Sequence, residues 1–285
     1  MTEADIVVTR IGSGGDGLAD WPGDGRGAVV PFTLPGERVR ARAVGRRGDL
    51  VTAEAEAVLE PSPDRVIPPC RHFGTCGGCA LQHWADAPYR AWKRERLVQA
   101  LERAGFPDAA PLVRDTVVSP PRSRRRADLA LRRGGTGVAI GFHARGDARV
   151  VDMHECHVLD PKLFALVAPL REVLLRLNAL KRDGSAVMNL LDSGPDLLLR
   201  TDAPLSPADR KLLAGFAEAQ GLRRIGWGTG KGATETAAQT GPVSLQLRGV
   251  SVAPAPGAFL QATPQGEAAI ADAMLDALPE RLPGR

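Results

Sequence analysis

The sequence has no long apolar run, no basic leader and few aromatic residues. Its longest apolar stretch, near Leu163–Leu170, is too short to span a bilayer, and its first five residues include two acids where a secretory signal would be basic. We therefore expect a cytoplasmic protein that does not enter a membrane. One tyrosine, seven phenylalanines and four tryptophans offer few rings on which nucleobases could stack.

Cysteine is also scarce, but its four copies form a pattern. Cys70, Cys76 and Cys79 share one loop, in which Gly77-Gly78 lets the backbone amides approach the sulfur atoms. Cys156 lies 77 positions beyond Cys79. In a reducing compartment such a pattern indicates a metal site rather than disulfide bridges. Four thiolates suit an iron–sulfur cube or a zinc ion, and the three-plus-one spacing favours the cube over two matched zinc knuckles.

Zinc remains an alternative at this point, because a histidine could replace one of the cysteines. We expect the histidines to lie around the metal site, on the surface or facing RNA instead. The histidines concerned are His72, His83, His154 and His157. A radical-type cluster is disfavoured because it leaves one iron open with three ligands, whereas this site has a fourth.

The rest of the composition is that of a globular protein. Hydrophobic residues make up 44% and charged residues 25% of the 285, which allows two or three compact units. The net charge of +4 is unevenly placed, since residues 114–149 hold nine arginines against three aspartates. That segment carries +6 and leaves −2 for the remainder, so it could hold an RNA backbone or simply form a solvated face.

Residues 1–60 predict a small β-barrel of short strands separated by glycine and proline. One strand alternates Arg38, Arg40 and Arg42 with apolar residues, which predicts a basic stripe outside the barrel. The glycines of 12–17 match the dinucleotide fingerprint GxGxxG, but another turn rather than a helix is expected after them, so we interpret them as a hairpin. The expected strands are Ile6–Ile11, Ala28–Pro31, Arg38–Ala43 and Leu50–Val58.

The remaining chain predicts an amphipathic helix followed by an α+β layer. The first helix is expected at Ala87–Gly105, and a last one begins with Thr263 as N-cap and Pro264 at its first position and is stopped by Pro279 and Pro283-Gly284. Further helices are expected at Pro161–Leu180 and Ser206–Gln220. Strands are expected at Ala127–Arg132, Gly137–Phe142, Arg149–Asp152, Ala186–Leu191, Leu197–Thr201 and Arg223–Trp227.

Several segments together resemble the TRAM-containing, iron–sulfur RNA uracil-5-methyltransferases. The cysteine loop from Cys70 to His83 resembles the cluster loop of that family, and Leu34-Pro35-Gly36-Glu37 in the barrel looks like part of a TRAM domain. Two further segments, Ser123–Ala127 and Val151–Leu159, are similar to the family's stretches before the central sheet and around the fourth cysteine.

Near its end the chain is similar to the family's Phe-x-Gln-x-Asn stretch. The matching residues are Phe259 and Gln261, with Thr263 in place of the usual asparagine. The resemblance implies that Gln261 and Phe259 contact S-adenosylmethionine, that the four cysteines bind a 4Fe–4S cluster, and that the methyl acceptor is C5 of a uridine flipped out of structured RNA. It favours 23S rRNA as partner, with tRNA as the alternative and no DNA expected.

The resemblance also implies a domain layout. It places an OB-like TRAM barrel at 1–60, a central iron–sulfur and RNA-binding domain at 61–250, and the first edge of a Rossmann-like, S-adenosylmethionine-dependent domain at 251–285. The family's catalytic cysteine and glutamate would lie beyond residue 285, so we expect a chain truncated before most of the catalytic domain, with no catalytic residue of its own. A non-catalytic RNA-binding module, with iron–sulfur or zinc, is the alternative.

Individual RNA contacts are expected from arginines and one histidine. Arg122, Arg124, Arg125 and Arg126 precede a strand, so only alternate members can share a face, and two of the four are expected to contact RNA. The other expected contacts are Arg38, Arg40 and His72.

Overall fold

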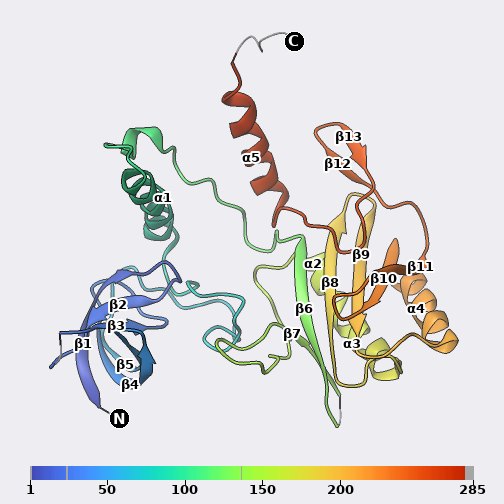
Figure 1. Ribbon diagram of the computed structural model, residues 1–285, viewed down its shortest axis with the longest axis horizontal. Helices are drawn as coiled ribbons and strands as arrows, with labels where there is room; N and C mark the ends of the chain where they lie inside the picture. Colours follow the sequence, from blue (N-terminus) through green and yellow to red (C-terminus); the bar gives the residue numbers. More distant parts are fainter. Residues whose placement is uncertain (1, 24, 136, 280–285) are drawn as a thin grey trace. The chain divides into compact units, whose positions relative to one another are not determined.

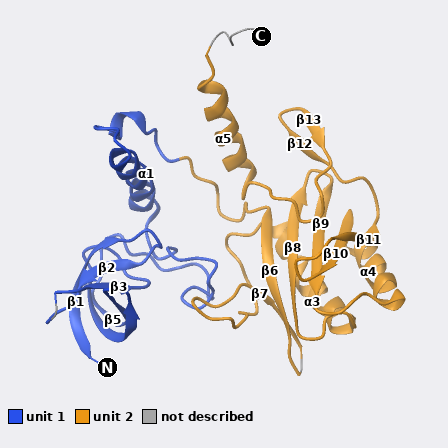
Figure 2. Ribbon diagram, viewed as in Figure 1, with its two compact units in different colours: residues 1–116 blue, residues 117–285 orange. Residues whose placement is uncertain are grey.

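A computed structural model describes residues 2–23, 25–135 and 137–279, and it divides the chain into two compact units. The units are Met1–Thr116 and Val117–Arg285 (Figure 2). The division between Thr116 and Val117 lies within the expected central domain, 61–250. None of the described helices is long and apolar enough to cross a membrane.

The first unit opens with a closed five-stranded barrel (Figure 1). Its inward-facing residues alternate along the strands, as in β4, where Val39 and Ala41 are fully buried between exposed or half-exposed arginines. The strands pair in the order β1-β2-β3-β5-β4. Their bounds are β1 Glu3–Ile11, β2 Gly17–Asp20, β3 Gly27–Val30, β4 Arg38–Arg47 and β5 Leu50–Glu60.

Strand β2 occupies the segment that the sequence predicted to turn again after the glycines. The glycine-rich segment forms a hairpin between β1 and β2, and a strand rather than a helix follows it, so no dinucleotide fingerprint is present here. A Cβ atom at Gly17 would lie 2.0 Å from Thr33 Oγ1, so only glycine fits at the start of β2.

After the barrel, the chain forms the cysteine loop and helix α1, Asp86–Arg103, followed by the short 3-10 helix η1, Ala110–Leu112. The predicted helix Ala87–Gly105 is confirmed within two residues at each end. The aromatic rings of Trp84, Tyr89 and Trp92 pack together beside the buried Ile11 and Leu34. This contact fixes the first turns of α1 against the β1–β2 region of the same unit.

The second unit is built on a six-stranded sheet in the order β11-β10-β9-β8-β6-β7. Only β9 and β10 run parallel, and α4 connects them; the other neighbours are antiparallel. The α+β prediction is confirmed. The bounds are β6 Arg126–Arg133, β7 Val138–Gly141, β8 Asp183–Leu191, β9 Gly194–Thr201, β10 Arg224–Thr229, β11 Glu235–Gln239, α2 Pro161–Phe164, α3 Val167–Arg176 and α4 Pro207–Gln220.

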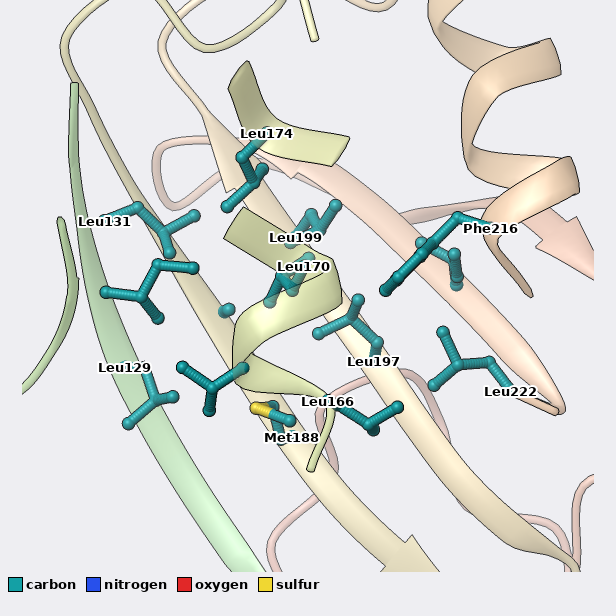
Figure 3. Packing of buried hydrophobic residues seen from close by; sticks show 14 of the residues in the cluster. Leu129, Leu131, Leu166, Leu170, Leu174, Met188, Leu197, Leu199, Phe216 and Leu222 are labelled. Carbon is teal, nitrogen blue, oxygen red and sulfur yellow. The ribbon is translucent and has the colours of Figure 1, made fainter. Parts of the chain in front are cut away.

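The core of this unit lies between the sheet and helices α2 to α4 (Figure 3). Leu170 of α3 and Phe216 of α4 meet Leu129, Leu197 and their neighbours on the strands, and all of these side chains are at most 5% exposed. Close packing of leucines from six elements is the main source of stability here, since each buried leucine contributes about 1.5–3 kcal/mol.

Two local predictions in this unit are wrong. Segment 149–152 is not a strand: it pairs with residues 142–144 through the isolated bridge Val150–His143 and the backbone bonds Ala144 to Arg149 and Val151 to Phe142. The predicted helix Pro161–Leu180 is divided into α2 and α3, and α3 ends at Arg176 because Leu177 is extended. The guanidinium of Arg133 accounts for that end, since it donates to the carbonyls of Leu174, Leu175, Leu177 and Leu180.

The predicted ends of the helix Ser206–Gln220 and the predicted start of the last helix are confirmed. Ser206 and Asp209 form a reciprocal capping box at the start of α4, and Gly221 in the left-handed region follows its end. Thr263 caps α5, Pro264–Asp276, by accepting from the Gly266 amide at 3.0 Å. The small hairpin of β12, Leu245–Leu247, and β13, Val250–Val252, precedes it. The expected stop at Pro283-Gly284 lies outside the described residues, as does Met1.

A buried ion pair joins β9 to β10. The Asp196 carboxylate accepts from Nε and Nη2 of Arg224 at 2.8 and 3.0 Å, and the two side chains are 1% and 10% exposed. The pair Arg210–Glu235 in the same unit has the same chemistry, but both side chains are more than 40% exposed.

We predict that Asp196→Ala destabilises the second unit by about 3–5 kcal/mol, because it leaves the Arg224 charge buried without a partner. The matched variant Glu235→Ala, which breaks the exposed pair, should cost less than about 1 kcal/mol. Urea unfolding followed by far-UV circular dichroism measures both. Equal losses in the two variants would contradict the prediction.

Candidate functional site

Cys70, Cys76 and Cys79 lie in one tightly turned loop of the first unit. The loop is closed by backbone bonds from Phe73 to Cys70 at 3.0 Å and from Cys76 to His72 at 2.8 Å. All three thiols are half-buried. The amide of Gly78 donates to Cys76 Sγ at 3.4 Å, which confirms that the glycine pair brings backbone amides to sulfur.

Cys156 belongs to the second unit. It follows the irregular segment after β7 rather than a strand end, which corrects the expected delivery by a strand. Its Sγ accepts from the Leu159 amide at 3.3 Å, and its side chain is half-buried. Both units thus offer half-buried sulfur with an amide directed at it, which suits thiolate ligands. Among the described residues, however, no three Cys, His, Asp or Glu side chains converge on one point that could hold a metal ion.

His83 is the one histidine that the structure encloses completely. Its ring packs against Phe73 at 5.2 Å between centroids and against Phe32 at 6.4 Å, and none of it is exposed. Burial and the nearby Arg65 guanidinium lower its pKa from 6.5 to about 4. His83 is therefore neutral at pH 7. Phe73 packs in this group, whereas His72 is half-buried in the loop.

The predicted arginine patch separates into exposed and buried members. Arg122 and Arg124 are exposed, with Arg122 in the left-handed region at φ 57. Arg126 is half-buried, and its guanidinium lies 5.8 Å from the centre of the Phe259 ring.

Arg125 is a correction to the RNA-binding set. It is 6% exposed, its Nε donates to the Gln261 carbonyl at 3.2 Å, and its Nη2 pairs with Glu267 of α5. Its backbone amide also donates to the Ala262 carbonyl at 2.8 Å. Arg125 therefore attaches the chain before α5 to the start of β6, because its backbone amide, Nε and Nη2 all have partners in that part of the chain.

The arginine stripe on the barrel is paired with carboxylates. Arg40 donates to Asp5 at 3.0 Å and lowers the pKa of that carboxyl, and Arg38 donates to Glu60 at 2.7 Å. Arg42 pairs with Glu54 and Glu56 in the same way. The stripe is exposed as predicted, but its charge is balanced, so it attracts a phosphate backbone less strongly than the sequence pattern indicates.

The segment expected to touch S-adenosylmethionine crosses the sheet before α5, with Pro256 beside Gly226 of β10 and Gly257 beside Leu198 of β9. Phe259 is 74% exposed and Gln261 is half-buried. The segment is held in place by Arg125 and by Asn189, whose Nδ2 donates to the Ala258 carbonyl at 3.0 Å. The side chains of Phe259 and Gln261 are thus presented by a fixed backbone.

One group of residues was missed by sequence reasoning. Tyr89, Trp92 and Lys93 of α1 line a hollow together with the β1–β2 hairpin and the end of the cysteine loop. Their spacing of i, i+3 and i+4 places them on one helix face and is the signal that could have found them.

Comparison with known proteins adds to this geometry. The chain is 39% identical over 282 residues to an uncharacterized RNA methyltransferase of Caulobacter vibrioides, covering 94% of this chain and 63% of that protein. It is 38% identical over 226 residues to the 23S rRNA (uracil(1939)-C(5))-methyltransferase RlmD of Halomonas elongata, covering 78% of this chain and 46% of that protein. The chain resembles RNA methyltransferases.

Its similarity extends along nearly the whole chain, but the chain spans less than two thirds of the length of these curated relatives. No protein-family model matches it. A solved structure, the Pyrococcus abyssi tRNA (uracil-54, C5)-methyltransferase in complex with S-adenosyl-L-homocysteine, has a TM-score of 0.64 and covers 96% of this chain and 65% of that one. At 20% identity this likeness concerns the fold alone.

We predict that the stability of the first unit falls as pH is lowered from 7 towards 4, with His83 as a main cause. The unfolded histidine takes up a proton near pH 6.5 and the folded one only near 4, so the stability present above 6.5 is lost in that window. The full loss from this group is about 3 kcal/mol. Urea midpoints of the whole chain at pH 7 and pH 4.5 measure it.

The control is the substitution of a titrating ring by a similar one that does not titrate. His83→Phe should show a smaller difference between the two midpoints than the unsubstituted chain, and His72→Phe should not. Carboxyls that do not interact with His83 titrate alike in these proteins, so their contribution cancels. An unchanged pH dependence in His83→Phe would refute the assignment.

Proposed function

We propose that this chain acts in S-adenosylmethionine-dependent methylation of uridine C5 in structured RNA, with 23S rRNA as the substrate. The observation that carries the proposal is the similarity, at 38–39% identity, to relatives named RNA methyltransferases, among them an enzyme named for uracil C5 of 23S rRNA. A second relative with that name, from Bordetella parapertussis, is 37% identical over 204 residues.

The described surface supports an RNA partner. Arg122 and Arg124 are exposed in the segment of net charge +6, and neither has a carboxylate within 4 Å among the described ion pairs. Each guanidinium can grip two phosphate oxygens, and each neutralised phosphate releases counterions. The proposal therefore assigns RNA contacts to these two arginines and no longer to Arg125.

The proposal keeps a 4Fe–4S cluster held by Cys70, Cys76, Cys79 and Cys156. The half-buried sulfurs and the amides of Gly78 and Leu159 directed at two of them fit thiolate ligands. A cluster with four protein ligands leaves no iron open, so it would serve structure or electron transfer. Zinc bound by the same thiols is the competing occupant.

Methyl transfer to C5 needs a nucleophile that adds to C6 and a base that removes the C5 proton. The chain has no cysteine besides the four assigned to the metal. The proposal accordingly gives this chain two roles, namely holding RNA and contributing Phe259 and Gln261 to the cofactor site. S-adenosylmethionine supplies the methyl group when it is bound there.

Anaerobically purified protein should contain about four irons and four sulfides per chain, with broad visible absorption that is lost on oxidation. Cys79→Ser should lose most of this iron, whereas Ser251→Ala, a change of similar size at an exposed position of strand β13, should keep it. One zinc and no iron per chain would refute the cluster and leave the RNA proposal in place.

A protein that carries this chain and has the full length of its relatives should transfer labelled methyl groups from S-adenosylmethionine to unmodified 23S rRNA. Nuclease digestion and mass spectrometry should locate the label at uridine C5, and unmodified tRNA should accept far less. Gln261→Ala should raise the KM for S-adenosylmethionine. Absence of C5-methyluridine in every RNA supplied would refute the function, and preferential methylation of tRNA would change the substrate.

A further inference from the structure

The first unit contains a hollow of about 380 Å³ at one end of helix α1. This volume is within the range of about 300–1,000 Å³ that is usual for small-molecule and cofactor sites. Cys79 lines it, but Cys70 and Cys76 do not, so the hollow is not the space between the thiols of the loop. Its lining residues are Ser13, Gly14, Gly15, Gly78, Cys79, Ala80, Leu81, Gln82, Tyr89, Trp92 and Lys93.

Aromatic rings form one wall of the hollow. Tyr89 and Trp92 are stacked with their centroids 6.1 Å apart and their planes 28° apart, and Trp84 packs behind them at 6.3 and 5.8 Å. Trp84 is buried, whereas Tyr89 and Trp92 remain partly exposed on the side of the hollow. Partly exposed rings held rigid from behind are the surfaces on which unpaired nucleobases stack.

A positive charge accompanies these rings. Lys93 Nζ lies 5.1 Å from the centre of the Trp92 ring and 5.4 Å from that of Tyr89. The Lys93 side chain is exposed, and no carboxylate is paired with it in the described part of the chain. A cation at the rim beside aromatic faces can bind a phosphate while the attached base lies against the rings.

Gln82 is one of the residues that line the hollow. Gln82 Oε1 is buried and has no hydrogen-bond partner within the described residues. A buried acceptor without a partner is destabilising, so a ligand that donates to Gln82 Oε1 once the side chain rotates towards the hollow gains affinity. Every RNA base carries an N–H donor on its Watson–Crick edge, and only an unpaired base has that edge open.

The opposite wall is set by a close approach of two loops. Gly15 is in the left-handed region at φ +86, and a Cβ atom there would lie 3.3 Å from Ala80 Cβ. Glycine at this position therefore lets the β1–β2 hairpin approach the end of the cysteine loop and close the side of the hollow. The shape depends on contacts inside the first unit alone.

We propose that this hollow binds one unpaired nucleobase of single-stranded RNA. The base stacks on Trp92 and Tyr89, its Watson–Crick edge donates to Gln82, and Lys93 binds the adjoining phosphate. This inference rests on the proposed function in one respect, namely that the chain binds RNA. It adds a base-binding site built from residues of the first unit, whereas Phe259 and Gln261 belong to the second.

The test measures binding of a ten-nucleotide oligoadenylate to the whole chain by fluorescence anisotropy, with an RNA duplex of equal length as the comparison. Trp92→Leu should weaken binding of the single strand by about five- to 150-fold, which is the loss of stacking one base. Binding of the duplex should change less than twofold. Stacking should also quench tryptophan fluorescence in the unsubstituted chain, and this quenching should diminish in Trp92→Leu.

Because Trp92 also packs against Trp84, a second variant keeps the test independent of folding. Lys93→Gln should reduce the slope of log Kd against log salt concentration by about 0.7, the value for one phosphate contact on a single strand. Arg103→Gln removes the same charge from an exposed position of the same helix, outside the hollow, and should leave the slope unchanged. Circular dichroism checks that each variant is folded.

The outcomes separate this inference from the proposed function. If the unsubstituted chain binds RNA and folded Trp92→Leu and Lys93→Gln bind the single strand as it does, the hollow is not a base site and the inference is refuted. If the unsubstituted chain binds neither single-stranded RNA nor 23S rRNA, the proposed function fails and the inference fails with it.

Discussion

The organisation of the first unit depends on one buried carboxylate, that of Glu37. It has no exposed surface and accepts hydrogen bonds from the Leu34 amide at 2.8 Å and from Arg65 Nη2 at 2.8 Å, as well as from the Ser62 amide. Burial alone would raise its pKa, but these donors hold the pKa below its ordinary value. Glu37 thus remains charged and ties the chain after β5 to the barrel.

The contacts of Arg65 in turn position the cysteine loop. Arg65 donates to the Phe32 carbonyl at 2.9 Å and forms a bridge with Trp84, and Val66 donates to the His83 carbonyl. The residues just before and just after the cysteine loop are therefore paired with each other on the barrel. This pairing sets both the loop and the start of α1, so the hollow beside Trp84 depends on a charge that the barrel encloses.

Several elements could be predicted because their signals are local. The N-cap Thr263 determines where α5 begins, and alternation along β4 fixes its buried face whatever the rest of the chain does. Strand β2 could not be predicted, because four residues following a glycine-rich segment also fit a turn. The end of α3 could not be predicted either, because it depends on Arg133, which is more than forty positions away.

The difference between local signals and contacts between distant residues also explains which arginines were predicted correctly to face solvent. Sequence gives charge and order along the strand, but whether an arginine faces solvent depends on what the fold places opposite it. Arg125 meets Glu267, 142 positions away, and Arg38 and Arg40 meet acids on neighbouring strands, so three of the predicted RNA contacts are neutralised by partners that no local pattern reveals. Arg122 and Arg124 have no such partner among the described ion pairs and retain their charge for a ligand.

Aromatic residues are scarce in this chain, but several of them are gathered in one place. Half of the four tryptophans and the single tyrosine gather at the start of α1, beside the loop that ends with Gln82. A hydrophobic contact between helix and barrel needs apolar area but not partly exposed rings with a cation above them, and leucine would serve it as well. The faces of Tyr89 and Trp92 that are exposed are therefore not accounted for by packing among the described residues of the first unit, whereas stacking against a base would use them.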